Sequence, residues 1–118
     1  MWDPASWTSG SPYFKRYTTT GTQIDTTVLT DGTYDVHSMD TVWTGSEFGV
    51  TWMEDRGGTG HLMINRVTPI GIVVDTPMSV ATRDVDWNSS SNHMAWTGSA
   101  YAMTWLDDVT EQVYMSVV

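Results

Sequence analysis

Cysteine is absent from the 118 residues, so the chain has no disulfides and no thiolate metal ligands, and its redox compartment is unconstrained. Basic residues are few: five Lys and Arg stand against fourteen Asp and Glu, which gives a net charge of −9. Because this balance repels phosphate backbones and anionic lipid headgroups, we expect no nucleic-acid partner and no membrane partner.

Long apolar runs are also missing. No stretch approaches the ~20 apolar residues that cross a bilayer. The first residues lack the basic and apolar regions of a signal peptide. We therefore expect a soluble chain, with the cytoplasm as its default location.

Helix-forming patterns are scarce too. Thr, Ser, Gly and Asp are abundant, Ala and Leu are few, and no window sustains a period of 3.6 residues. The apolar segments are short, often alternate with polar residues, and are separated by Gly, Asp and Ser, as in β-strands joined by tight turns. The sequence predicts an all-β fold and a single domain over residues 1–118.

What the sequence does contain is an internal repeat. The ten residues from Trp43 to Trp52 recur 53 positions later, from Trp96 to Trp105, with six of the ten identical. A shift of 50 aligns further pairs: Trp2 with Trp52, Arg16 with Arg66, Thr18 with Thr68, Gly21 with Gly71, Asp25 with Asp75 and Thr26 with Thr76. Residues 112–118 match residues 61–67. We divide the chain into a partial repeat (1–38), a full repeat (39–92) and a partial repeat (93–118).

One repeat predicts four antiparallel strands, over residues 39–44, 47–54, 61–68 and 72–80, followed by a polar connection over 81–92. Pro77 marks the fourth strand as an edge strand, because proline cannot donate to a ladder. Four short strands every ~50 residues are typical of a β-propeller blade. A β-sandwich or barrel of about ten strands is the alternative. We favour blades because the strands carry apolar residues on both faces.

The repeated unit is Trp-Thr-Gly-Ser, a variable residue, Phe or Tyr, a small residue, Val or Met, and Thr-Trp, followed by an acidic turn, an apolar strand and a glycine turn. This pattern resembles the blades of bacterial multi-bladed β-propeller proteins over nearly the whole chain. The resemblance implies a ring of about six to eight blades, whereas this chain carries about two.

Two blades would leave apolar faces and strand edges uncovered, which predicts a partner. We expect the partner to be a copy of the chain, joined head to tail into a ring. A trimer or a tetramer would supply six or eight blades. A symmetric dimer that pairs edge strands is a further possibility, and a monomeric β-fold is another.

The tryptophans divide into two groups. Trp2, Trp43, Trp52, Trp96 and Trp105 recur with the repeat, and repeated positions usually serve packing between sheets. Trp7 and Trp87 lie outside the repeat. With Asp86 and Asn88 they provide the exposed ring and polar groups that a carbohydrate site needs. A loop tryptophan folded over the edge of the core is the simpler alternative for both.

The remaining candidates indicate no chemistry. Residues 84–92 place oxygen atoms at alternate positions as calcium loops do, but lack the glycine and the bidentate Glu. The acid pairs 54–55 and 107–108 would suit glycoside hydrolysis only if they faced one another across a sugar, and turn chemistry explains them more simply. His37, His61 and His93 share no metal-ligand spacing. We therefore expect no catalytic residue, no metal and no cofactor.

The sequence thus predicts a non-enzymatic, propeller-like module that binds carbohydrate or another small polar ligand in grooves between blades or chains. Two alternatives remain open. One is a structural or vestigial propeller fragment without a ligand. The other is an enzyme similar to glycoside hydrolases, with acids that converge in the oligomer.

Overall fold

The computed structural model describes residues 12–83, 92–107 and 110–118. The all-β prediction is confirmed: the described residues form antiparallel strands and no helix, and hence no helix that could span a membrane. The strands are β1 (Tyr13–Tyr17), β2 (Gln23–Val28), β3 (Asp35–Trp43), β4 (Phe48–Asp55), β5 (Gly60–Val67), β6 (Met78–Arg83), β7 (Asn92–Trp96), β8 (Tyr101–Asp107) and β9 (Gln112–Val117).

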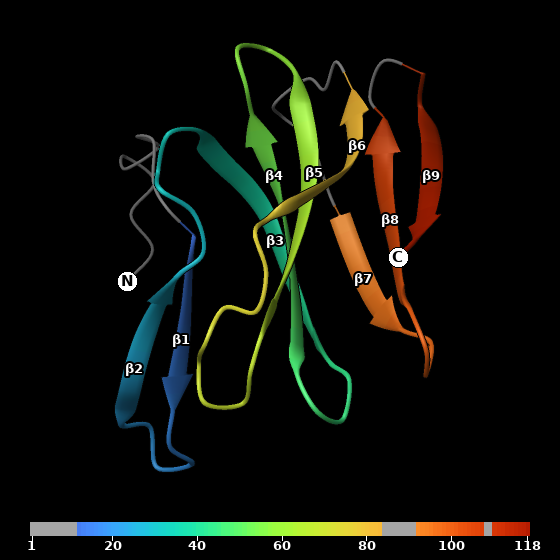
Figure 1. Ribbon diagram of the computed structural model, residues 1–118. Helices are drawn as coiled ribbons and strands as arrows, with labels where there is room; N and C mark the ends of the chain where they lie inside the picture. The colour runs from blue at the N-terminus through green and yellow to red at the C-terminus, as the bar shows by residue number, and fades with distance from the viewer. Residues whose placement is uncertain (1–11, 84–91, 108–109) are drawn as a thin grey trace.

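The strands form three sheets in chain order. The first sheet is β1-β2, the middle sheet is β3-β4-β5-β6 and the third sheet is β7-β8-β9. Figure 1 shows the three sheets side by side, with the middle sheet between the other two. All the pairings between these strands are antiparallel and join neighbours in sequence, so each sheet is a meander.

The prediction for the fourth strand of the repeat was wrong in its position. Pairing was expected over residues 72–80, but β6 begins at Met78 and runs to Arg83. Before it, Val73 makes an isolated bridge to Val67, and the Val74 N–H donates to the Arg66 carbonyl at 2.9 Å. Pro77 stands where the ladder is interrupted, because it has no N–H to donate. The predicted connection over 81–92 is also shorter than expected, because β6 extends to Arg83 and β7 begins at Asn92.

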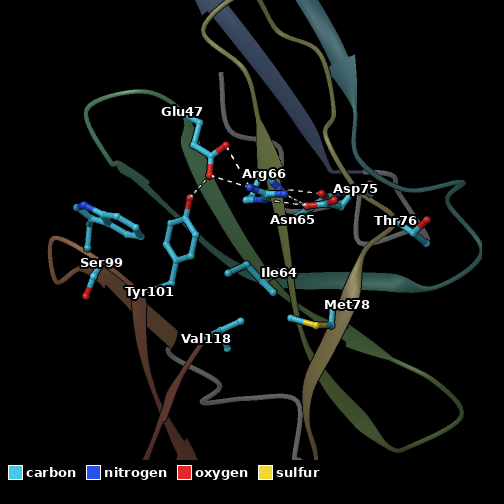
Figure 2. Close-up of a pocket in the computed structure, with 11 residues that line it drawn as sticks. Glu47, Ile64, Asn65, Arg66, Asp75, Thr76, Met78, Ser99, Tyr101 and Val118 are labelled. Carbon is cyan, nitrogen blue, oxygen red and sulfur yellow. Dashed lines mark hydrogen bonds and ion pairs between the residues drawn. The ribbon is translucent and has the colours of Figure 1, made fainter.

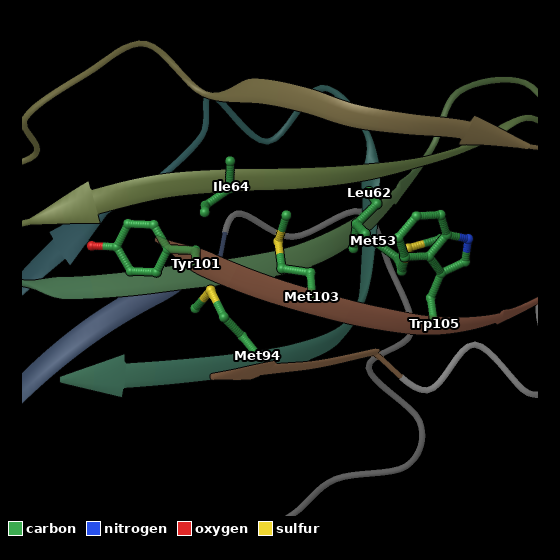
Figure 3. Close-up of a cluster of buried hydrophobic side chains, with 7 residues drawn as sticks. All are labelled: Met53, Leu62, Ile64, Met94, Tyr101, Met103 and Trp105. Atoms are coloured by element: carbon green, nitrogen blue, oxygen red, sulfur yellow. The ribbon is translucent and has the colours of Figure 1, made fainter. Parts of the chain in front are cut away.

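The middle sheet is buried on both faces. One apolar cluster lies between the middle sheet and the first sheet. Its buried members are Leu29, Val50, Trp52, Met63 and Val67. A second apolar cluster lies between the middle sheet and the third sheet, as Figure 3 shows. Its buried members are Met53, Leu62, Ile64, Met94, Tyr101, Met103 and Trp105. Successive residues of β4 and β5 point to opposite faces, so a continuous apolar run serves both clusters.

Two kinds of turn occur twice with the same hydrogen bonds. The Thr44 N–H donates to the Glu47 carbonyl at 2.9 Å, and the Thr97 N–H donates to the Ala100 carbonyl at 2.9 Å. These are the Trp-Thr-Gly-Ser turns of the repeat, and in each the threonine hydroxyl also accepts a backbone N–H at 3.1 Å.

The second kind of turn spans residues 18–22 and 68–72. The Thr18 N–H donates to the Thr22 carbonyl at 2.8 Å, as the N–H of Thr68 does to its counterpart at residue 72. Gly21 and Gly71 have φ angles of +88° and +84°, in the left-handed region that favours glycine. The two turns therefore share one backbone design.

Candidate binding groove

A groove of about 660 Å³ lies between the middle and third sheets. From the middle sheet and the segment before β6 it is lined by Glu47, Ile64, Asn65, Arg66, Asp75, Thr76 and Met78. From the third sheet it is lined by Trp96, Ser99, Tyr101 and Val118. Figure 2 shows the charged side chains gathered at one end of the groove and Ile64, Met78 and Val118 at the other.

The polar end is an ion-pair network centred on Arg66. Its Nε donates to Asp75 Oδ2 at 2.7 Å, and its Nη1 donates to Glu47 Oε1 at 3.3 Å. Asp75 and Glu47 together raise the pKa of the guanidinium. With two carboxylates and one cation, the network carries a net charge of −1, so it favours a neutral or hydrogen-bond-donating occupant over an anion.

Tyr101 joins this network to the third sheet. Its hydroxyl donates to Glu47 Oε1 at 3.0 Å. Burial, and then the hydrogen bond and charge of Glu47, raise the pKa of Tyr101 from 10.0 to about 12. The phenol therefore remains a proton donor throughout the neutral range, and it holds one carboxylate oxygen in place.

Asn65 forms hydrogen bonds with the backbone of both Arg66 and Asp75, the two residues of the shorter ion pair. This buried side chain donates through Nδ2 to the Asp75 carbonyl at 2.9 Å. Its Oδ1 accepts the Arg66 N–H at 2.7 Å. Asn65 thereby ties β5 to the segment before β6, across the position where Pro77 interrupts the regular ladder.

An aromatic pair forms the wall on the third sheet. The rings of Trp96 and Tyr101 lie 4.9 Å apart at 59°. The repeat-equivalent pair in the middle sheet, Trp43 and Phe48, lies 4.7 Å apart at 51°. These tilted arrangements suit the ring quadrupoles, and the rings offer a flat apolar surface beside polar groups.

The equivalent surface between the first and middle sheets is occupied by a turn. Arg16 pairs with Asp25 as Arg66 does with Asp75, and the Arg16 Nη1 donates to the Pro69 carbonyl at 2.7 Å. The Thr27 hydroxyl donates to the Gly71 carbonyl at 2.6 Å. The first sheet is thus clamped to the turn of residues 68–72. A Cβ at Gly71 would lie only 3.1 Å from Arg16 Nε and from Asp25 Oδ2, so the fit is close.

A smaller pocket of about 410 Å³ lies where the chain passes from the first sheet into the middle one. The Arg56 guanidinium lies 4.7 Å from the centre of the Tyr34 ring, and its Nη2 donates to Glu54 Oε2 at 2.8 Å. Glu54 is buried, and its Oε1 accepts the Trp52 indole N–H at 2.9 Å. Asp31 also lines this pocket, and hydrogen bonds from Thr33 lower its pKa.

The tryptophans of the repeat lie in different surroundings. Trp52 and Trp105 are buried in the two apolar clusters. Trp96 is half-buried in the groove wall, and Trp43 is 46% exposed. Trp43 and Trp96 are the last residues of their strands, which explains why they reach the rim rather than the core.

The proposed carbohydrate residues Trp7, Asp86, Trp87 and Asn88 lie outside the described residues, as does Trp2. Residues 84–91 of the suggested calcium segment lie outside them as well. Among the residues that the structure describes, no group of three or more His, Asp or Glu could hold a metal ion.

Of the acid pairs, Glu54, Asp55 and Asp107 have local partners, and Asp108 lies outside the described residues. Asp55 accepts the Gly58 N–H at 2.6 Å, and Asp107 accepts the Thr110 N–H at 3.2 Å. Both contacts shape hairpin turns, as turn chemistry predicts. Glu54 instead points inward to Trp52 and Arg56.

The sequence reasoning missed the network of Glu47, Arg66 and Asp75. A usable signal was present, because Arg16 and Asp25 align with Arg66 and Asp75 at one shift of 50. A basic residue and an acidic residue repeated at the same spacing within one chain indicate an ion pair of the repeat.

No family model matches the chain, and no curated protein or solved structure matches it.

Proposed function

We propose that the chain is a non-enzymatic, β-propeller-like binding module whose first partner is a copy of itself. Head-to-tail association would place each end sheet against the middle sheet of a neighbouring copy. This assignment rests on one observation: residues at the same repeat position are buried in the middle sheet and exposed in the end sheets.

The first sheet provides half of that observation. Met63 and Val67 of the middle sheet are 2% and 0% exposed, because the first sheet covers them. Their repeat equivalents on the outer face of β1, Tyr13 and Tyr17, are 54% and 53% exposed. The first sheet therefore presents a surface of the kind that a preceding blade covers.

The third sheet provides the other half. Leu62 and Ile64 are 1% and 4% exposed under the third sheet. Their equivalents in β9, Val113 and Met115, are 72% and 68% exposed. This second surface is of the kind that a following blade covers, so the two ends of the molecule are complementary rather than alike.

Complementary ends favour a heterologous contact, which closes into a ring when the rotation per copy allows it. Two blades per copy would give six blades from three copies and eight from four. We favour these closed states because either one covers both apolar faces of every copy.

The apolar face of β9 provides the test. Met115→Glu places a charge at the centre of the proposed contact and is expected to shift the native mass, measured by light scattering, to that of the monomer. Ile70→Glu is the matched control, because Ile70 is 65% exposed but lies in the turn of residues 68–72, away from both proposed contact faces. An unchanged mass for Met115→Glu, in a variant whose far-ultraviolet spectrum is that of the parent, would contradict the proposal.

The smaller pocket supports a second candidate function, the binding of a neutral, hydroxyl-rich ligand such as a carbohydrate. Its aromatic ring, Tyr34, lies beside Asp31, Glu54 and Arg56. Rings that stack on a sugar face and charged groups that bind hydroxyls are the usual components of such sites. Trp52 donates a hydrogen bond to Glu54, so its fluorescence should report ligand binding in this pocket.

A glycan array followed by tryptophan fluorescence titration tests this second candidate. Binding should shift the emission, and Tyr34→Ala should abolish the shift. Ile70→Ala is the control, because Ile70 is exposed, lies outside the two proposed contact faces and does not line the pocket. Glycan binding that persists in Tyr34→Ala would show that the glycan does not bind in this pocket.

A further inference from the structure

We infer that the smaller pocket selects neutral sugars by a pair of hydroxyls on adjacent ring carbons, which bind between Arg56 and Asp31. The inference rests on the carbohydrate-binding candidate proposed above and names the ligand feature that this pocket recognises. One observation carries it: a charged donor and a charged acceptor line the same pocket and do not bond to each other.

Segments from the interior of the chain form this pocket. Its lining residues come from the connection between β2 and β3, from β4, β5 and the hairpin that joins them, and from Thr76 and Pro77. Figure 1 shows the β2–β3 connection and the β4–β5 hairpin at the same end of the molecule. The volume of about 410 Å³ is near the lower end of the ~300–1,000 Å³ range of ligand sites, so it suits a single sugar residue.

The donor is Arg56, and buried Glu54 holds its guanidinium in place. Glu54 Oε2 accepts from Arg56 Nε at 3.0 Å and from Nη2 at 2.8 Å, and the guanidinium lies 4.7 Å from the centre of the Tyr34 ring. The other oxygen of Glu54 accepts the Trp52 indole N–H, so the carboxylate is itself fixed. Nη1 makes no hydrogen bond to any residue that the structure describes, so it can donate to a ligand.

The acceptor is Asp31. Its Oδ1 accepts the N–H and the hydroxyl of Thr33, at 2.9 and 2.6 Å. These hydrogen bonds and, to a smaller extent, the charge of Arg56 lower the pKa of Asp31, so the carboxylate is ionised at neutral pH. Within the described part of the chain Oδ2 has no hydrogen-bond partner, and an ionised carboxylate oxygen can only accept.

Arg56 and Asp31 lie close to each other without forming an ion pair. Opposite charges affect a carboxyl pKa in this way when they are within about 4–6 Å. In the described residues the ion pair of Arg56 is with Glu54 instead. Because both side chains line the pocket, ligand oxygens that enter between them can accept from Nη1 and donate to Oδ2.

Two adjacent hydroxyls satisfy these side chains better than one hydroxyl does. A single hydroxyl has one hydrogen to donate, whereas Oδ2 offers two lone pairs and Nη1 offers two N–H groups. A hydroxyl on the neighbouring ring carbon adds a second donor and further lone pairs within reach of the same groups. The two carboxylates and one guanidinium leave a net negative charge, which disfavours uronic acids and sulfated sugars.

Matched deoxy sugars test the inference on the parent protein. The probes are the methyl glycosides of mannose, galactose and glucose, each with its 3-deoxy and 6-deoxy derivatives, titrated by nuclear magnetic resonance. Both derivatives lack one hydroxyl, but only the 6-deoxy sugar keeps hydroxyls on adjacent ring carbons. For any glycoside that binds, we expect the 3-deoxy sugar to bind about tenfold or more weakly than the 6-deoxy sugar, because hydrogen bonds to charged groups are among the strongest.

Asp31→Asn tests the acceptor. Asparagine retains an oxygen for Thr33 but places an amide donor where Oδ2 accepts, so the variant should bind the 6-deoxy sugar about tenfold or more weakly than the parent does. Glu111→Gln is the matched control, because it also removes one carboxylate charge but lies in a turn of the third sheet and does not line the pocket.

Each result separates the inference from the candidate function beneath it. Equal affinity for the 3-deoxy and 6-deoxy sugars, or unchanged binding by Asp31→Asn, overturns the inference and leaves carbohydrate binding standing. No binding of any of these glycosides overturns both.

Discussion

A Cβ atom at Gly49 would lie 2.4 Å from Cε1 of the Tyr101 ring, although the two residues belong to different sheets. Cδ1 and Cζ of the same ring would lie 2.9 and 3.0 Å away, so no rotation about the far end of a flexible side chain relieves the contact. Gly49 is buried, and the Tyr101 ring lies against it where the third sheet meets the middle one. The absence of a side chain at this point sets how closely the two sheets approach.

Gly49→Ala should therefore lower the free energy of unfolding by about 1–3 kcal/mol, the usual cost of overpacking. Chemical denaturation monitored by tryptophan fluorescence measures it. The control is the repeat-equivalent position, Ala102, which already carries a Cβ; Ala102→Gly should cost only about 0.5–1 kcal/mol. Equal losses of stability at the two positions would contradict the claim that contact with the Tyr101 ring causes the loss in Gly49→Ala.

Tyr101→Phe should cost about 1–2 kcal/mol at neutral pH, because it removes a hydrogen bond to a charged acceptor. The repeat-equivalent residue, Phe48, shows that a ring without the hydroxyl fits such a site. Denaturation of parent and variant side by side gives the difference.

The same pair predicts a pH dependence. The folded state raises the pKa of Tyr101 from 10.0 to about 12, so it holds the phenolic proton more tightly than the unfolded chain does. This contribution to stability is complete below pH 10 and is lost as the pH rises from about 10 to about 12. Over that window the parent should lose more stability than Tyr101→Phe does. Parallel curves for the two proteins would contradict the assignment.

Glu54→Ala should lower the free energy of unfolding by about 1–3 kcal/mol, because it leaves the buried indole N–H of Trp52 without its acceptor. Glu54→Gln retains an acceptor for Trp52 and loses only the charge opposite Arg56, so its cost should be clearly smaller. A ranking in which Gln is as damaging as Ala would instead assign the main role to the ion pair.

The sequence was informative where structure is local. The predicted strands over 39–44, 47–54 and 61–68 lie within a few residues of β3, β4 and β5. The position of β6 could not be read in this way. The effect of Pro77 depends on where pairing with β5 can resume, and Asn65 contributes to that from the neighbouring strand.

The groove depends on contacts between sheets, which local patterns do not specify. Glu47 and Tyr101 are 54 residues apart, and nothing in either neighbourhood indicates that they meet. Trp43 and Trp52 belong to the same repeated unit, yet one lies at the rim and the other in the core, because burial depends on where a strand ends against its neighbours. The repeated Arg and Asp were the one visible sign of the polar network.

The native mass of the 118-residue chain, measured by mass spectrometry under non-denaturing conditions, tests the central claim most directly. The exposed equivalents of buried residues, Tyr13 and Tyr17 at one end and Val113 and Met115 at the other, predict a closed oligomer of three or four copies. A monomer at micromolar concentration would contradict the claim, because both apolar faces would then remain in water.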